Sequence, residues 1–505
     1  MRKRVALLNS IFGIIYMIVS AIGAILVRRY FIIILGEEYL GLTAIFTSIF
    51  GILITLDCGV SSAVFFKIYE PLNSNNQDRI SSVFALIKKV YTIRALAVFV
   101  VGLAVVPFLP IITAKSSFDI AFVNKVYFVY MTLTTVSYLF IFYNFFLEAI
   151  QKKYITSLIM TVTYVLSVVL QIAMLKTSPR YIWYITIALL QPIIAYIFCR
   201  FLAFRYYPYL KHKKKIEDED KKDFTKLLGM AFHSMSAVIA SYTDSFLISA
   251  FTGVASLGLY DNYRVIGTKV TALLDQVTSS IKDPMRSLLA ENDKEHAETV
   301  LQNVTFVVFV VALNCSTLFV GLINPFVSIW IGDRFILDNS IVIVTGMNMF
   351  LASLNYILVD TYYYVRAFEK DKKSPIIEIL VNLGFSFIFG LQMGITGVLL
   401  GTVLYYITQF ILRGRRLYNL YFQKSYRNFF GQCATYVIVV LVSIIAFLKL
   451  SDFLMTRLNS FLTIGITGIL ILILDNLFVY ILYRKGDRFL YCKEAVSSIV
   501  RRKKR

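Results

Sequence analysis

The chain has few of the residues that build disulfide frameworks and metal centres. Its 505 residues include five cysteines and three histidines. The cysteines are scattered without a CxxC pair, and no histidine lies close to another in the sequence. Thiolate and imidazole metal sites need such ligands at short, regular spacings. We therefore expect neither a disulfide framework nor a metal cofactor.

Charged residues are also scarce, at 16% of the chain against 58% hydrophobic residues, and the mean hydropathy is +0.72. Apolar blocks of about 18–30 residues recur, each long enough to cross a hydrocarbon core about 30 Å thick as a helix. The sequence predicts an all-α polytopic membrane protein with about fourteen transmembrane helices and no sizeable soluble domain. These spans lie at about 8–35, 41–66, 84–109, 120–147, 155–175, 181–203, 227–250, 257–281, 300–323, 340–365, 375–392, 394–412, 430–450 and 459–483.

The net charge of +21 raises the question of nucleic acid as a partner. Most Lys and Arg residues, however, fall in every second connection, notably 200–226, 413–427 and 484–505. This is the positive-inside pattern of a multi-pass membrane protein, and it predicts that both termini are cytoplasmic. We expect no nucleic acid partner, and we interpret the basic tail as a contact with anionic lipids. A signal peptide at residues 1–24 is the alternative for the first block, but the apolar run continues past it.

A faint internal repeat predicts two halves. Residues 35–42 (LGEEYLGL) resemble residues 252–259 (TGVASLGL), and the two glycines of each segment have the same spacing. An even number of crossings separates the segments, so the halves have the same orientation. Chance similarity between apolar segments is the alternative. The predicted domains are an N-terminal six-helix bundle (1–205), a cytoplasmic linker (206–226), a second six-helix bundle (227–412), two further transmembrane helices (413–484) and a basic cytoplasmic tail (485–505).

Arg28 and Arg29 lie inside the apolar run from Val5 to Leu35. One arginine at the centre of a span costs about 2.5–3.5 kcal/mol on insertion scales. The pair therefore needs an anionic partner, a polar cavity or a route to the interface. We expect Arg28 to face the interior, because it continues the helical face of Ser20.

The predicted span at 257–281 carries a polar stripe at helical spacing, formed by Arg264, Thr268, Thr271 and Asp275. Other spans contribute carboxylates, namely Asp57, Asp244 and Asp360. Hydrocarbon rejects such faces, so they should point at protein or water. Two interpretations stay open: structural pairs that tie helices together, or the lining of a polar cavity.

No phosphate-binding loop is present for ATP hydrolysis. The nearest sequence, from Gly397 to Gly401, has no lysine and lies inside a span, where it is better interpreted as a GxxxG packing face. The driving force should then be the membrane potential, removal of product, or exchange of Na+ or H+. The candidate coupling residues are Asp57, Asp244, Asp275 and Asp360.

Short motifs along the chain resemble those of polysaccharide-biosynthesis flippases, in the superfamily that also holds multidrug and toxin extrusion transporters and lipid II flippases. The motifs are LGEEYLGL (35–42), LDCGVSSA (56–63), YTDSFLI (242–248), LGLY (257–260), Pro284, WIGDRF (330–335) and GITGVLLG (394–401). The resemblance implies two six-helix bundles in a V around a central cavity, with two extra C-terminal helices. It also implies alternating access for a polyprenyl-diphosphate-linked oligosaccharide. In the lipid II branch, arginines in spans one and eight hold the diphosphate, and Arg28 or Arg29, and Arg264, occupy comparable places here.

The expected function is therefore a flippase, not an enzyme, in the bacterial cytoplasmic membrane. Its expected partners are the lipid-linked oligosaccharide, membrane lipids, and the polymerase and glycosyltransferases that act on the same sugar. Asp57, Asp244, Thr268, Thr271 and Asp275 are the expected polar lining. An ion-coupled drug or cation antiporter of the same fold is the main alternative. A membrane polymerase or ligase is disfavoured, because every predicted outer loop is short.

Overall fold

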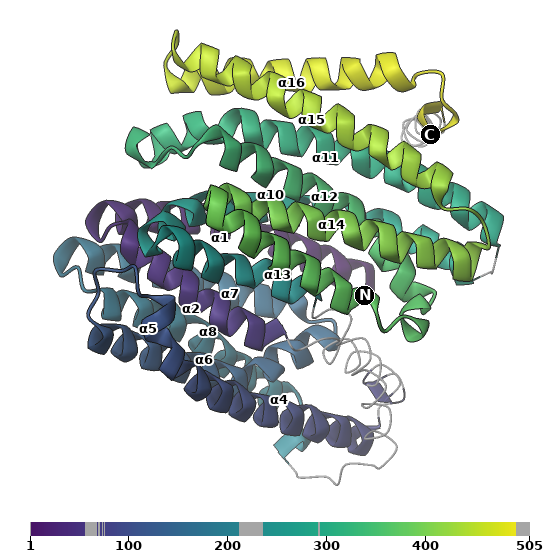
Figure 1. The fold of residues 1–505 in the computed structure, drawn as a ribbon. Coiled ribbons are helices and arrows are strands. Elements are labelled where there is room, and N and C mark those ends of the chain that lie inside the picture. The colour runs from purple at the N-terminus through teal and green to yellow at the C-terminus, as the bar shows by residue number, and fades with distance from the viewer. Residues whose placement is uncertain are drawn as a thin grey trace. The chain divides into compact units, whose positions relative to one another are not determined.

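The structure is a computed structural model that describes residues 2–55, 76–211, 236–290 and 293–490, with residues 68, 71–72 and 74. These residues form helices joined by short connections, and there is no β-strand among them (Figure 1). The all-α prediction is thereby confirmed for the described part of the chain. The chain divides into two compact units, Met1–Gly258 and Leu259–Arg505.

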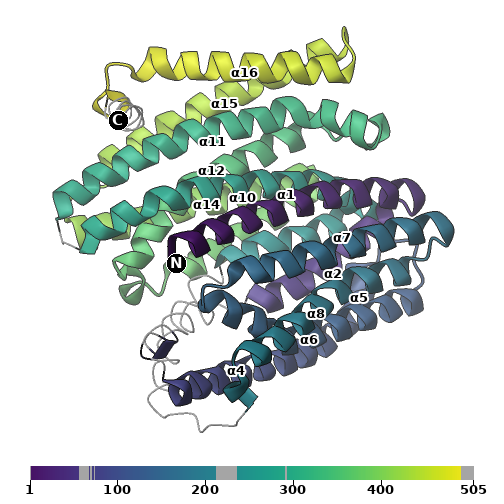
Figure 2. The same cartoon turned by 180° about the vertical axis from the view of Figure 1, so that it is seen from behind.

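Within its described residues, the first unit contains the following longer helical elements. They are α1 (Arg2–Ile34), α2 (Glu37–Thr55), α4 (Gln77–Val105), α5 (Leu109–Ile112), α6 (Ile120–Ala149), α7 (Lys153–Thr177), α8 (Tyr181–Tyr206) and a helix at residues 236–252. Two short 3-10 turns, Val106–Phe108 and Pro208–Lys211, extend α4 and α8. α1 packs against α7, and α6 packs against both α4 and α8 (Figure 2).

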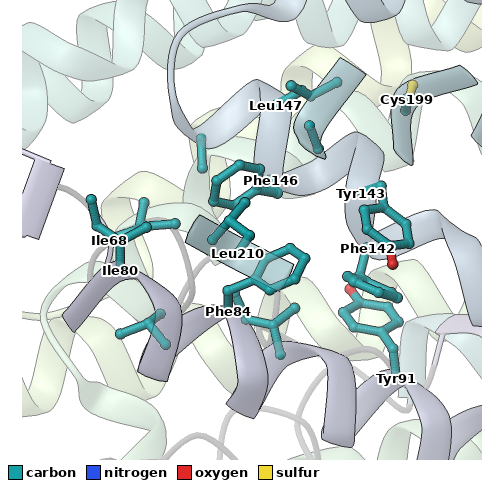
Figure 3. Close-up of a cluster of buried hydrophobic side chains, with 14 of the residues drawn as sticks. Ile68, Ile80, Phe84, Tyr91, Phe142, Tyr143, Phe146, Leu147, Cys199 and Leu210 are labelled. Atoms are coloured by element: carbon teal, nitrogen blue, oxygen red, sulfur yellow. The ribbon is translucent and has the colours of Figure 1, made fainter. Parts of the chain in front are cut away.

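An aromatic core holds α4, α6 and α8 together. Phe84 of α4 lies with its ring centroid 5.5 Å from Phe142 and 5.1 Å from Phe146, both on α6 (Figure 3). Tyr91 and Tyr143 belong to the same buried cluster. Ring pairs at these spacings add about 0.5–1.5 kcal/mol beyond the burial of their area. This cluster therefore fixes the position of α6, the helix that also bears Tyr130.

α7 has its polar face inside and its apolar face outside. Its buried residues are mostly polar: Thr156, Ser157, Thr163, Ser167, Gln171 and Leu175. Its exposed large apolar side chains are all aliphatic: Leu158, Val162, Val165, Leu166, Val169 and Leu170. A soluble protein would reverse these two faces. The arrangement is that of a helix that faces lipid on one side and hydrogen-bonds to protein on the other.

The second unit contains most of α10 (Val254–Ala290) and the helices that follow it. These are α11 (Lys294–Trp330), α12 (Asn339–Tyr364), α13 (Ser374–Met393), α14 (Ile395–Leu417) with its π-helical extension Tyr418–Phe422, α15 (Arg427–Met455) and α16 (Ser460–Tyr483), with 3-10 turns at Asp333–Phe335 and Ala367–Lys370. α11 packs against α12, α15 and α16, and α14 packs against α12 and α13.

Two glycine patterns of the sequence have a counterpart in the structure. Gly36 and Gly253, which correspond in the predicted repeat, both have positive φ, at 97° and 95°. Glycine adopts this conformation without the steric cost that other residues meet. Gly397 and Gly401 bring α14 onto α13, because added Cβ atoms would lie 2.0 Å from the Phe389 carbonyl oxygen and 2.1 Å from the Ser386 hydroxyl. The prediction of a GxxxG packing face is confirmed.

Eleven described helices are long and apolar enough to cross a membrane. α2, the helix at 236–252 and α10 are not among them. α10 carries several charged residues within one predicted span, which lowers its hydropathy. The fourteen-span arrangement and the domain boundaries stay predictions, and the compact units divide at Gly258 rather than in the linker.

Candidate functional site

Arg28 and Arg29 lie near the end of α1, and their surroundings differ. Arg28 is half-buried, whereas Arg29 is exposed. The Arg28 guanidinium is close enough to Tyr184 of α8 to act on it electrostatically. Tyr184 in turn packs against Phe31, with 4.6 Å between the ring centroids. Of the two arginines, Arg28 is therefore the one turned towards the protein.

The polar positions nearer the start of α1 contact α7 and the turn that precedes it. The Asn9 amide donates a hydrogen bond to the Gln151 carbonyl (3.2 Å), and its oxygen accepts one from the Tyr154 backbone N–H (2.8 Å). The Tyr164 hydroxyl donates to the Ser20 carbonyl at 3.1 Å. These residues act in helix packing. They fix the rotation of α1 about its axis, and with it the direction of Arg28.

Near Arg28, hydroxyl groups converge from three helices, and we call Thr43, Thr47, Tyr130, Tyr181 and Tyr184 the hydroxyl cluster. The Thr43 and Tyr181 hydroxyls are 2.7 Å apart, and those of Thr47 and Tyr130 are 3.0 Å apart. Tyr184 interacts electrostatically with both Arg28 and Tyr130. The tyrosines of this cluster did not stand out from the other Tyr residues in the sequence, because nothing in their spacing separates them.

Ser245, the residue after Asp244, connects the helix at 236–252 to α2. The Ser245 and Ser48 hydroxyls form a buried hydrogen bond of 2.8 Å. Asp244 is half-buried and has contacts of its own. Asp57, the other predicted carboxylate of this unit, lies outside the described residues.

In the second unit, Arg264 forms an ion pair within its own helix. Its Nε and Nη2 donate to Asp261 Oδ1 at 2.8 Å and 2.5 Å. The side chain of Asp261 is buried and that of Arg264 is 22% exposed. Part of the Arg264 charge is therefore already neutralised, which agrees with the interpretation of this residue as a structural pair.

The rest of the predicted stripe on α10 is less uniform than its spacing suggests. Thr268 is exposed and its hydroxyl donates to the Val265 carbonyl at 2.9 Å, whereas Thr271 is half-buried and donates to the Gly267 carbonyl at 3.0 Å. Asp275 on α10 and Asp360 on α12 are half-buried and have contacts. The two threonine hydroxyls are thus satisfied within their own helix.

A buried ion pair between α13 and α14 was missed from the sequence. Arg413 donates from Nε and Nη2 to the two oxygens of Glu378, both at 2.7 Å, and the side chains are 1% and 0% exposed. Arg413 Nη1 also donates to the Tyr363 hydroxyl at 3.0 Å. Both residues fall at the ends of predicted spans, which hid the fact that they are buried together.

Asp371 extends this polar region into the connection before α13. Its carboxylate accepts hydrogen bonds from the Ser374 hydroxyl (2.6 Å), the Ser374 backbone N–H (3.1 Å) and the Tyr362 hydroxyl (3.0 Å). Burial alone would raise the pKa of Asp371. The hydrogen bonds outweigh burial and hold that pKa below its ordinary value. Asp371 is therefore ionised at neutral pH.

The described residues contain no group of three or more His, Cys, Asp or Glu side chains that could hold a metal ion. In the first unit, the described Arg28 lies beside a group of hydroxyls. In the second unit, the described residues include buried contacts between acidic and basic side chains. Such arrangements bind anions, hold helices together or take up protons.

Comparisons with known proteins identify the family. A family model described as "Polysaccharide biosynthesis protein" matches residues 6–281, more than half of the chain. No curated protein gives a significant match. Among solved structures, the lipid II flippase MurJ in an inward closed conformation is similar, with a TM-score of 0.65 and 17% identity over 95% of this chain and 99% of that one.

Two multidrug transporter structures are also similar. An inward-facing multidrug resistance MATE family transporter of the MOP superfamily has a TM-score of 0.60 and 14% identity, over 79% of this chain and 95% of its own. The MATE multidrug transporter DinF-BH has a TM-score of 0.57 and 15% identity, over 84% of this chain and 97% of its own. At these identities the likeness shows the fold.

The family match and the fold both agree with the order of motifs along the chain. The apolar exposed face of α7 and the eleven long apolar helices indicate that the chain lies in a membrane. The predicted family is confirmed: the chain belongs to the polysaccharide biosynthesis protein family, and it is an integral membrane protein with the fold of the MOP superfamily transporters.

Proposed function

We propose that the protein is a flippase. It carries a polyprenyl-diphosphate-linked oligosaccharide from the inner to the outer leaflet of the bacterial cytoplasmic membrane, for the synthesis of a cell-surface polysaccharide. The observation that carries this proposal is Arg28, a half-buried arginine in an apolar span beside the hydroxyl cluster. The family match and the likeness to a lipid II flippase support it.

Arg28 supplies the charge that a diphosphate needs. A guanidinium stays protonated at every physiological pH and donates two parallel hydrogen bonds to a phosphate group. A cation held in an apolar span is costly without an anion. An anionic group that binds beside Arg28 therefore interacts favourably with its charge.

The hydroxyl cluster supplies what the sugar needs. Its members already hydrogen-bond to one another, as Thr43 does to Tyr181 and Thr47 to Tyr130. Sugar hydroxyls can replace these partners one for one, so binding exchanges hydrogen bonds and leaves no buried group unsatisfied. The tyrosine rings add flat apolar surface for the faces of the sugar rings.

Arg264 has a lesser part in this proposal. Because Asp261 already neutralises some of its charge, a diphosphate gains less from Arg264 than from Arg28. Arg264 supplies a supporting contact that competes with its own carboxylate. Arg29 is exposed and serves as an interface residue.

The direction of transport has a physical basis. Moving one negative charge out of an electrically negative cytoplasm is favourable by about 2.3 kcal/mol per 100 mV, and a diphosphate carries roughly two such charges. Exchange of Na+ or H+ adds to this drive, with Asp57, Asp244, Asp275 and Asp360 as candidate sites. The polymerase and glycosyltransferases of the same polysaccharide are the partners that supply and consume the substrate.

An ion-coupled drug or cation antiporter is the second candidate, and the fold likeness to MATE transporters favours it. A cation substrate would be repelled by Arg28, whereas a diphosphate is attracted. The charge of the group that binds beside Arg28 therefore separates the two candidates.

The test is depletion of the protein in its own host, followed by extraction of lipid-linked intermediates. We expect a complete oligosaccharide to accumulate on its polyprenyl carrier in the inner leaflet, and re-expression of the wild type to remove it. If the lipid-linked intermediates stay unchanged and the depleted cells become sensitive to cationic drugs, the flippase assignment is wrong and the antiporter assignment is favoured.

A further inference from the structure

α16 presents a narrow buried face to α11. The buried residues of α16 recur every fourth position: Thr463, Thr467, Ile471, Asp475 and Val479. The two helices run antiparallel, since Ser460 meets Ser328 (3.2 Å) near one end and Asn476 meets Asn314 (2.9 Å) near the other. Asp475 therefore lies in the middle of a close helix–helix contact.

Asp475 is a carboxyl group deep inside a membrane span. It is 1% exposed and lies eight residues before Tyr483, which is about 12 Å from that end of the helix. Its Oδ2 is 2.6 Å from the Thr317 hydroxyl, and the Ser443 hydroxyl of α15 also interacts with it. Within the described residues no cation pairs with it.

Glu378 shows what an ionised carboxyl needs in this chain. It is equally buried, and it has two hydrogen bonds from Arg413 at 2.7 Å. An isolated ionised carboxylate is so costly to bury that a carboxyl without a cation takes up a proton instead. By this contrast, Asp475 is the neutral acid and Glu378 the anion.

The hydrogen bonds of Thr317 are compatible with the neutral form. Its hydroxyl has one proton and three oxygens within reach: the Leu313 carbonyl at 2.8 Å, the Asn314 carbonyl at 3.2 Å and Asp475 Oδ2 at 2.6 Å. When that proton goes to a carbonyl of α11, the short contact to Asp475 must be donated by the carboxylic acid. With Asp475 protonated, Thr317 can donate to one carbonyl of α11 while its oxygen accepts from the acid.

No other charged group among the described residues acts on this carboxyl. The nearest titratable side chains along the three helices are Cys315 on α11, Tyr436 and Lys449 on α15, and Tyr480 on α16. Lys449 and Tyr480 are exposed. The hydroxyls of Thr317 and Ser443 are the polar groups that contact Asp475 among the described residues.

The carboxyl also borders a recess between α15 and α16, with a volume of about 430 Å³. Ser443 and Asp475 are its polar lining, and Phe447, Leu474 and Phe478 are among its apolar residues. A small apolar molecule can therefore approach Asp475 through the lipid-facing side of these helices.

We propose that Asp475, together with Thr317 and Ser443, forms a proton-binding site within the membrane that holds its proton at neutral pH. Its use as the coupling proton of transport rests on the proposed function, but the site itself does not. Loss of the proton would place an uncompensated charge between α11 and α16, so proton binding and the packing of these helices are linked.

The test is labelling of the full-length protein in membranes with dicyclohexylcarbodiimide, followed by peptide mass spectrometry. The acid proton passes to a carbodiimide nitrogen, the carboxylate oxygen bonds to the carbodiimide carbon, and acyl migration gives a stable N-acylurea with no leaving group. We expect labelling at Asp475 at neutral pH, about tenfold or more above that at Glu378, because only the protonated acid reacts and Glu378 is held ionised by Arg413.

Asp475→Asn should abolish this label and keep the protein folded, because the amide mimics the neutral acid. Thr317→Val tests the hydrogen bond and should alter the pH at which labelling declines. Equal labelling of Asp475 and Glu378, or no label on Asp475, would overturn the proposal. Protection by Na+ and not by choline at equal ionic strength would overturn it in favour of a sodium site. None of these readouts depends on transport.

Discussion

Gly258 lies directly against Gly41. A Cβ atom on Gly258 would be 2.9 Å from the Gly41 nitrogen and 1.9 Å from the Glu37 carbonyl oxygen, and a Cβ on Gly41 would be 1.8 Å from the Val254 carbonyl oxygen. The two glycines that correspond in the predicted repeat thus form one backbone-to-backbone crossing between α2 and the start of α10.

Alanine at either glycine should weaken this crossing, because the obstructing atoms are backbone and cannot move aside. We expect Gly258→Ala to lower the unfolding free energy by about 1–3 kcal/mol, as overpacked contacts do. Thermal unfolding of the purified protein in detergent measures the effect. Gly13→Ala is the control: nothing lies within 4 Å of that site, so alanine should be neutral or slightly stabilising there.

Arg28 and Arg29 offer a matched pair for the proposed anion contact. Arg28→Ala should reduce export of the lipid-linked sugar about tenfold or more, whereas Arg29→Ala should change it little, because a charge-assisted hydrogen bond contributes about 1.5–3 kcal/mol. Surface polysaccharide is measured against the amount of protein in the membrane. Equal effects of the two substitutions would contradict the assignment of Arg28.

The Glu378–Arg413 pair should be far more sensitive than an exposed one. Arg413→Met leaves the Glu378 carboxylate buried alone, at an expected cost of about 3–5 kcal/mol. The double variant with Glu378→Gln should recover much of that loss in a thermal unfolding assay. The exposed pair of Arg366 and Glu369 is the control, and Glu369→Gln should cost less than about 1 kcal/mol. A milder effect at Arg413 than at Glu369 would refute this ranking.

Asp371 should make stability depend on pH in the acidic range. Because its folded-state pKa lies below the unfolded value, the carboxylate stabilises the protein above the unfolded pKa. That contribution falls as the pH drops through about 4 and is lost below the folded pKa. We expect Asp371→Asn to lower the melting temperature at pH 7, and the difference from wild type to shrink in acid. A difference that grows on acidification would show the opposite sign of shift.

The helices were largely predictable because apolar blocks of membrane-spanning length have one stable form in lipid. The predicted span at 120–147 corresponds to α6, and that at 459–483 to α16. The GxxxG segment and the matched spacing of Gly36 and Gly253 were also visible in the sequence, whereas the positive φ of the two glycines came from the structure.

The site was less predictable because pairing depends on rotation of each helix about its axis. The spacing of Arg264 and Thr268 placed them on one face, yet Arg264 pairs with Asp261 one turn away on the same helix. Asp475 stood alone in an apolar span, and only the packing of α11 shows that Thr317 meets it. Contacts between distant helices leave no local pattern in one sequence.

The ion pair between α13 and α14 affects how these two helices are inserted into the membrane. If α13 entered lipid by itself, Glu378 would lack its cation, and if α14 did so, Arg413 would lack its anion, each about one turn from the end of its helix. Only Gly394, with φ of 58°, separates the two helices. We therefore expect both helices to enter the bilayer as one hairpin, with their charges neutralised before either meets lipid.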